Sequence, residues 1–261
     1  MHEHEMLKRR FTDQVFKNKK RDTLSAIETA YADMSRRQPG HLPAMKDACI
    51  DRLVKNVFVN ELQIKDFDTW HEEQCNALVA IWNGIKPNWG SVGKAQKVLN
   101  MAFKYLSCIT DKYDNVCQNC HMTLDSYTLA WYKDIVRPWA KEHGYADVKE
   151  LTEWSKINSY SEYQLIQNNI RSFLCKGATY SVLIGSQTTR AIELSTVPME
   201  AEFVIWEGQI INERYTNLIK ELDNYIKDHR GTPAGKVHDA WLLGELFSDY
   251  LKDYAQNCFE V

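Results

Sequence analysis

The sequence predicts an all-α or mainly α protein, and three observations support this fold class. Six prolines and eleven glycines are few for 261 residues. Apolar residues recur every three or four positions wherever a pattern is legible, which is the period of an amphipathic helix. With 44% hydrophobic and 26% charged residues, the chain is long enough to bury a core without disulfides or metals. No repeat or linker divides it, so residues 1–261 are expected to form a single domain.

The first half of the chain contains three strong helical patterns. Apolar side chains at spacings of three and four mark residues 42–62. A capping box, Thr69 followed by Glu72, opens the next helix, which a turn of glycine and proline ends. After that turn, an apolar stripe over residues 95–106 predicts a helix that is central to the argument below.

The second half of the chain is also expected to be helical, with one exception. Helices are predicted at 124–137, where Pro138 follows, at 159–175 behind a cap at Ser159, from Pro198 through 222, and at about 236–256. Residues near 178–195 have weak helical signals and frequent Thr, Ser and Gly. A loop or a short strand pair is expected there.

Hydropathy, charge and cysteine content indicate the environment. No apolar run approaches the about 18 residues that cross a bilayer, and the start, MHEHEMLKRRF, has no apolar signal core. Seven cysteines, an odd number, favour free thiols in a reducing compartment. We therefore expect a cytoplasmic protein with no membrane partner. Its net charge of -3 argues against nonspecific coating of nucleic acid, so a DNA contact would need a local basic patch. Lys8–Arg10 and Lys17–Arg21 could supply one, or could be a solvated surface.

The run from Cys117 to His121 matches the CxxCH pattern of haem attachment. Haem attachment takes place outside the cytosol, and no export signal is seen. Zinc would need two ligands besides Cys117 and Cys120, and Cys108 is the only near candidate. A redox CxxC usually opens a helix after a strand. We therefore expect no metal and no cofactor, and two free thiols in a loop.

Residues 90–125 carry the strongest indication of chemistry. A glycine-containing turn opens a helix on which Lys94, Lys97 and Lys104 occur, and a later loop delivers Asp125. An amine is nucleophilic only when unprotonated, and burial among other cations lowers its pKa. Three ordinary exposed lysines are the alternative. A helix N-terminus preceded by small residues also presents free N–H groups to a phosphate.

The order helix, Gly-rich hairpin, lysine and aspartate resembles the helix-hairpin-helix DNA glycosylases, in particular the bifunctional enzymes for oxidised guanine. AQKVLNMAFKYL followed by HMTLDSYTL is similar to the compact all-helical archaeal 8-oxoguanine DNA glycosylases. The resemblance covers about residues 84–130 and places a helix-hairpin-helix segment at 69–109. It implies a base-excision glycosylase and abasic-site lyase. In that family the lysine attacks deoxyribose C1′ and forms a Schiff base, while the aspartate assists its deprotonation and stabilises positive charge on the sugar.

The resemblance assigns roles to residues of this chain. Lys97 would be the nucleophile and Asp125 the assisting carboxylate. Lys94, next to the glycines, and Lys104, 21 residues before the aspartate, are alternative nucleophiles. The suspected DNA partner would be held by Trp89, Gly90, Ser91, Gly93, Gln96 and Trp206. Of these, Gln96 would read a base edge, and Trp206 would close over the flipped nucleotide.

A second class of function remains open from the sequence. A noncatalytic helical protein that binds a protein or nucleic-acid partner, such as a regulator or inhibitor borne on a mobile element, would carry the same helices with exposed lysines. An enzyme that acts on another small molecule is a third interpretation. The Lys97→Ala substitution separates the first two, because it would abolish covalent chemistry in an enzyme and change little in a binding protein.

Overall fold

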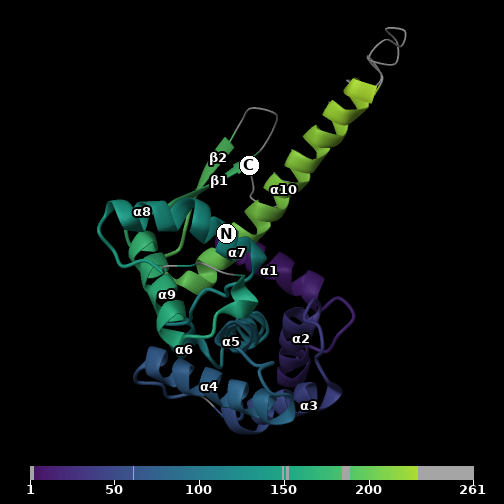
Figure 1. Ribbon diagram of the computed structural model, residues 1–261, viewed down its shortest axis with the longest axis vertical. Helices are drawn as coiled ribbons and strands as arrows, with labels where there is room; N and C mark the ends of the chain where they lie inside the picture. The colour runs from purple at the N-terminus through teal and green to yellow at the C-terminus, as the bar shows by residue number, and fades with distance from the viewer. Residues whose placement is uncertain (1–2, 61, 149, 151–152, 184–188, 229–261) are drawn as a thin grey trace.

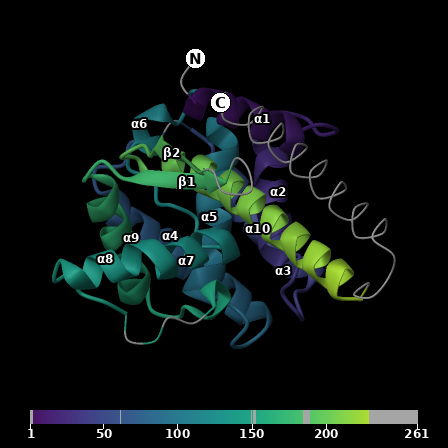
Figure 2. The ribbon, with the colours of Figure 1, turned by 90° about the horizontal axis from the view of Figure 1, so that it is seen from above.

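Helix α5 (Val92–Ser107) lies at the centre of the molecule in the computed structural model, which describes residues 3–60, 62–148, 150, 153–183 and 189–228. Every side chain of α5 except Lys94 is buried. Helices α2 (Thr23–Ser35) and α4 (Phe67–Ile85) pack along it. The apolar stripe predicted over 95–106 therefore forms the middle of the core, as Figures 1 and 2 show.

Two groups of helices flank α5. On one side lie α1 (Glu3–Val15), α2 and α3 (Pro43–Arg52), the last of which continues as the π-helical turn η1 (Leu53–Val57). On the other side lie α7 (Ser126–Trp131), the π-helical turn η2 (Tyr132–Val136), α8 (Arg137–Glu142) and α9 (Tyr160–Leu174). The one-turn helix α6 (Asp114–Cys117) and the 3-10 turn η3 (Trp154–Lys156) lie in the connections.

Helix α10 (Pro198–Asp228) crosses both groups and contacts α1, α7 and α9 (Figure 2). The antiparallel strands β1 (Thr179–Leu183) and β2 (Thr189–Glu193) pair from Thr179↔Glu193 to Leu183↔Thr189, and β1 packs on α10. The mainly α prediction with a short strand pair is confirmed. The helix predicted at 236–256 lies outside the described residues.

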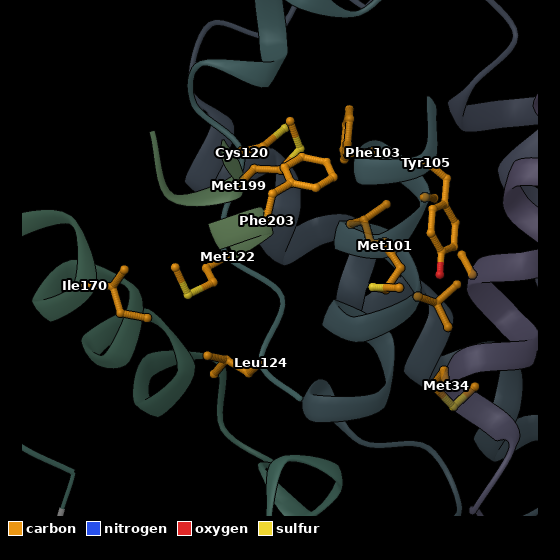
Figure 3. Packing of buried hydrophobic residues seen from close by; sticks show 14 of the residues in the cluster. Met34, Met101, Phe103, Tyr105, Cys120, Met122, Leu124, Ile170, Met199 and Phe203 are labelled. Atoms are coloured by element: carbon orange, nitrogen blue, oxygen red, sulfur yellow. The ribbon is translucent and has the colours of Figure 1, made fainter. Parts of the chain in front are cut away.

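The core joins segments that are distant in the sequence. Figure 3 shows Met101 and Phe103 of α5 between the loop residues Met122 and Leu124 and helix α2, toward which Tyr105 points. Ile170 of α9 and Phe203 of α10 face the same region. The apolar side chains that the described residues bury form one continuous cluster, apart from Ala140 of α8. No helix within these residues is both long enough and apolar enough to cross a membrane.

Two helix boundaries differ from the sequence prediction. Helix α4 begins at Phe67 rather than at the predicted box of Thr69 and Glu72, because Asp66 is the N-cap. Its Oδ1 accepts from the Thr69 backbone N–H at 3.2 Å, and its Oδ2 accepts from the Thr69 hydroxyl at 2.7 Å. Aspartate caps a helix at least as well as threonine, so the correct cap is one turn earlier. The helical pattern of 42–62 likewise ends at Val57.

The helix predicted to stop at Arg137 continues through Pro138 to Glu142. Proline lacks the N–H that an α-helix interior needs, but it is tolerated in a first turn. The π-helical turn η2 precedes it and leaves Pro138 in the first turn of α8. The α9 and α10 predictions are confirmed, since Ser159 caps α9 through its side chain and α10 begins at Pro198.

Candidate active site

Lys97 is the lysine whose surroundings most favour nucleophilic chemistry. It lies on α5 and is 9% exposed. Its ammonium lies 4.3 Å from the ring centroid of Trp154, and within the described residues it forms no hydrogen bond or ion pair. Burial lowers the pKa of Lys97, while the charge of Asp125 opposes the shift and Asp33 and Glu202 oppose it further. A neutral amine is therefore easier to form here than on an exposed lysine.

Asp125 is the acidic side chain whose charge acts most strongly on the Lys97 amine, and it is held in place by the start of α7. Its Oδ1 accepts from the backbone N–H of Tyr127 at 2.9 Å and of Thr128 at 3.1 Å. The Asp125 N–H in turn donates to the Thr128 hydroxyl at 2.9 Å, which completes a capping box. Every side-chain hydrogen bond recorded for Asp125 within the described structure uses Oδ1. One oxygen thus anchors the carboxylate, and Oδ2 stays available to a proton or a positive charge.

Lys104 is also buried, but it forms an ion pair with Glu202. Its ammonium is 1% exposed and donates to Glu202 Oε1 at 2.9 Å. Glu202 Oε2 accepts from the Thr123 N–H at 2.7 Å. Burial raises the pKa of Glu202, and Lys104 opposes that shift. Removing the Lys104 proton would leave an unpaired buried carboxylate, which is strongly unfavourable. Lys104 therefore fits a structural ion pair better than a nucleophile.

Lys94 lies on the surface of the hairpin. Its ammonium donates to the Trp89 carbonyl at 2.6 Å and lies 4.2 Å from the centroid of the Trp89 ring. Burial lowers the pKa of Lys94, with a further contribution from Lys86. The Trp89 indole N–H donates to the Pro39 carbonyl at 3.0 Å. Lys94 and Trp89 thus connect the α4–α5 turn to the segment after α2.

The glycines of the hairpin serve close backbone packing. The Gly90 N–H donates to Asn83 Oδ1 at 2.7 Å, and the Gly93 N–H donates to the Ile157 carbonyl at 2.8 Å. Ser91 caps α5 by accepting from the Lys94 N–H, and its hydroxyl donates to the Ser155 carbonyl at 2.7 Å. The two glycine amides are therefore engaged inside the protein. This geometry argues against the predicted phosphate contacts by Gly90 and Gly93.

Gln96 is engaged inside the protein as well. It is fully buried, and its Nε2 donates to the carbonyls of Gly93 at 2.9 Å and Leu124 at 2.8 Å. Its Oε1 accepts from Leu124 N–H and from Asn100 Nδ2, both at 3.1 Å. An amide with all these bonds has no capacity left to read a base edge. Gln96 instead fixes the loop that places Asp125.

Trp206 of α10 is partly exposed and belongs to an aromatic cluster. Its ring centroid lies 5.9 Å from that of Phe11 and 6.0 Å from that of Tyr127, both edge to face. A hollow of about 10 Å³ between α1 and α10 includes Trp206. A larger hollow of about 530 Å³ is lined by α1 and the residues after it. Lys97 and Asp125 line neither of these two hollows.

A buried polar network that the sequence did not reveal meets α5 at Asn100. His71 of α4 is fully buried, with Nδ1 2.8 Å from the Tyr160 hydroxyl and Nε2 2.9 Å from Asn100 Oδ1. His121 is also fully buried, with Nδ1 2.8 Å from the Tyr163 hydroxyl. The two imidazole centroids lie 4.6 Å apart. His71 follows Phe67 by one helical turn, and this position on the apolar face was the only sequence signal.

Asp68 closes the network on its outer side. It accepts from both terminal nitrogens of Arg171, at 2.7 and 2.8 Å, and lies 2.7 Å from His121 Nε2. Burial lowers the pKa of His121 to about 4, although Asp68 opposes this shift. Burial is also the main reason that the pKa of His71 lies well below its usual value. Both rings are thus neutral near pH 7, and the network joins α4 to α9.

The described residues contain no group of three or more His, Cys, Asp or Glu side chains arranged to hold a metal ion. The chain matches no protein-family model, no curated protein and no solved structure. The functional argument therefore rests on the geometry around Lys97 and Asp125.

Proposed function

We propose that the protein is a DNA base-excision glycosylase and abasic-site lyase that uses Lys97 as its nucleophile. The observation that carries the proposal is that Lys97 is 9% exposed, feels the charge of Asp125, and forms no ion pair within the described residues. Lys104 is engaged with Glu202, and Lys94 bonds the hairpin carbonyl of Trp89. Lys97 is thus the best nucleophile of the three.

The chemistry follows from these two side chains. The neutral Lys97 amine attacks C1′ of the damaged nucleotide, the N–C bond forms, and the glycosidic bond breaks with its electron pair going to the base. The base takes up a proton as it leaves. Opening of the sugar ring at the C1′–O4′ bond gives a protonated Schiff base, and O4′ takes the proton lost from nitrogen. Loss of a C2′ proton then expels the 3′ phosphate and cleaves the strand.

Asp125 supports this sequence in two ways. Its free Oδ2 can accept the proton that Lys97 must lose before it attacks. The same negative charge stabilises the positive charge that develops on the sugar and on the Schiff-base nitrogen. Its other oxygen is fixed by the amides of Tyr127 and Thr128, so little reorganisation is needed during the reaction.

Basic side chains close to Lys97 fit a DNA backbone better than the hairpin amides do. Arg36 and Arg37 follow α2 directly and are exposed. Lys86 donates to the Gly40 carbonyl at 2.9 Å, so the α4–α5 turn with Lys94 lies against the segment that follows α2. Salt-dependent contacts by these four cations would supply the nonspecific part of DNA binding.

The second candidate is a noncatalytic helical protein that binds a protein or nucleic-acid partner. The observation in its favour is that Gly90, Gly93 and Gln96 bond within the protein. The hairpin would then be a packing device, and Lys97 a buried cation beside Asp125. This candidate predicts binding without a covalent intermediate.

Borohydride trapping separates the two candidates. The full chain is incubated with DNA that contains an abasic site or 8-oxoguanine, and borohydride reduces any Schiff base to a stable amine that is seen as a shifted band. We expect an adduct with the parent protein and with Lys94→Gln, which removes a lysine from the same helix. We expect none with Lys97→Gln, and slower formation with Asp125→Asn. Circular dichroism confirms that each variant is folded.

Two other results would contradict the mechanism or the choice of nucleophile. If the parent protein gives no adduct on either DNA, the Schiff-base mechanism is wrong and the binding protein becomes the function to pursue. If Lys97→Gln keeps the adduct while Lys94→Gln loses it, the nucleophile is Lys94, and the burial argument for Lys97 fails.

A further inference from the structure

Cys117 and Cys120 form a thiol pair at the end of α6. Cys117 is the last residue of this one-turn helix, and the chain turns immediately after it, with the Cys120 N–H donating to the Cys117 carbonyl at 3.1 Å. The two side chains are close enough for each to shift the pKa of the other. The loop expected from the sequence is thus a turn that brings both sulfur atoms together.

This turn meets the geometric requirement of a disulfide. Residues i and i+3 of a hydrogen-bonded turn have Cα atoms less than about 7 Å apart, and disulfides need Cα separations of about 4.4–6.8 Å. The Cα separation expected for this turn thus lies within the range that a Cys117–Cys120 disulfide needs. The Cys120 sulfur currently lies 3.6 Å from the Val116 carbonyl, a weak bond that the disulfide replaces.

The two thiols have unequal surroundings. Cys117 is 9% exposed and precedes the exposed residues Gln118 and Asn119, whereas Cys120 is fully buried. Figure 3 shows Cys120 beside Met199 and Phe203 of α10. Both thiols are buried, but Cys117 keeps a small exposed surface and Cys120 has none, so a reagent from solvent meets Cys117 first. The hydrogen bond from Cys120 lowers the pKa of Cys117, and burial raises the pKa of Cys120.

We propose that Cys117 and Cys120 are a reversible dithiol–disulfide site that exchanges with low-molecular-weight disulfides of the glutathione class, with Cys117 as the attacking thiol and Cys120 as the resolving thiol. A thiol that keeps some contact with solvent reacts before one that has none, which gives each cysteine its role. The site is independent of the proposed DNA chemistry, because it uses neither Lys97 nor Asp125.

The exchange proceeds in two balanced steps. The Cys117 thiolate attacks one sulfur of glutathione disulfide, a protein–glutathione S–S bond forms, and one glutathione thiolate leaves. Cys120 then loses its proton, and its thiolate attacks the Cys117 sulfur and expels the second glutathione thiolate. Two protein thiols are oxidised to one disulfide, and one glutathione disulfide is reduced to two thiols.

Mass spectrometry of the full-length native protein tests this site. The protein is equilibrated in buffers of varied glutathione-to-glutathione-disulfide ratio, alkylated under denaturing conditions and digested with trypsin. Residues 113–133 form one tryptic peptide that contains only these two cysteines, and residues 172–176 form another that contains the exposed Cys175. We expect the 113–133 peptide to lose two hydrogens without gaining alkyl groups, and Cys175 to gain glutathione.

Two single variants test the assigned roles. With Cys120→Ser, we expect Cys117 to retain one glutathione, because the resolving thiol is gone. With Cys117→Ser, we expect Cys120 to stay reduced, because solvent does not reach it. The proposal is wrong if the parent 113–133 peptide stays reduced in a buffer that modifies Cys175. The assigned roles are wrong if Cys120 gains glutathione in Cys117→Ser while Cys117 stays reduced in Cys120→Ser.

Discussion

Gly93 approaches the backbone of Trp154 so closely that the effect of an added methyl group can be worked out. An alanine Cβ at this position would overlap the Trp154 carbonyl oxygen and lie 2.8 Å from its carbon. Both atoms belong to the backbone, so no side-chain rotation relieves the contact. The 3-10 turn η3 must move away from the start of α5.

That displacement has a definite energetic consequence. It separates the Gly93 N–H from the Ile157 carbonyl and the Ser91 hydroxyl from the Ser155 carbonyl, which are bonded at 2.8 and 2.7 Å. Overpacking costs about 2 kcal/mol, and each weakened hydrogen bond costs about 1 kcal/mol. The better helix propensity of alanine returns up to about 1 kcal/mol. We expect Gly93→Ala to lower the free energy of unfolding by about 3 kcal/mol.

Gly84 of α4 provides a matched control. It is also helical, but nothing lies within 4 Å of the Cβ that an alanine would add. Gly84→Ala should therefore raise the free energy of unfolding, by at most about 1 kcal/mol. Urea unfolding followed by far-UV circular dichroism measures both variants against the parent. A Gly93→Ala protein whose free energy of unfolding lies within about 0.5 kcal/mol of the parent would refute the close approach. An equal loss in Gly84→Ala would show that the effect does not come from the contact with Trp154.

Three further predictions concern ionisable side chains. Lys104→Met should lower the free energy of unfolding by about 3–5 kcal/mol, because it leaves Glu202 buried without its cation. Adding Glu202→Gln should recover part of this loss. A Lys104→Met protein with the urea midpoint of the parent would contradict the prediction. His121 has a folded-state pKa of about 4, below its unfolded value. Its contribution to the free energy of unfolding is therefore present above pH 6.5 and is lost as pH falls. The loss should be about 2 kcal/mol between pH 7 and 5. The urea midpoint should fall over this range, and a flat profile would refute a neutral buried His121. Asp68→Asn should cost about 2 kcal/mol at pH 7 by weakening the bonds to Arg171 and His121, and an unchanged thermal midpoint would show that these bonds contribute little.

The helices were readable from the sequence wherever local chemistry defines them. The α5 stripe, the Ser159 cap and the start at Pro198 depend on residues within a few positions of one another, and they are found as predicted. The errors arose where two local signals competed. Asp66 caps α4 in place of Thr69, and a π-helical turn allows the chain to remain helical through Pro138.

For the candidate site, the sequence predicted three alternative nucleophiles without deciding among them. Spacing along α5 could not choose among Lys94, Lys97 and Lys104, because all three are lysines of one helix. Their surroundings come from distant segments: Trp154 covers Lys97, and Glu202 neutralises Lys104. Burial and charge pairing depend on which segments meet, and a linear pattern does not contain that information.

The sequence by itself determined the helical fold class, most element positions and the set of polar residues available for chemistry, because periodicity, caps and composition act over a few residues. The tertiary structure alone decided what those residues do. In the folded protein, the amides of Gly90 and Gly93 and the side chain of Gln96 form internal hydrogen bonds. The tertiary structure also brought His71 and His121 into one buried network. Desolvation and hydrogen-bond satisfaction are properties of packed segments, so they emerge only when distant parts of the chain meet.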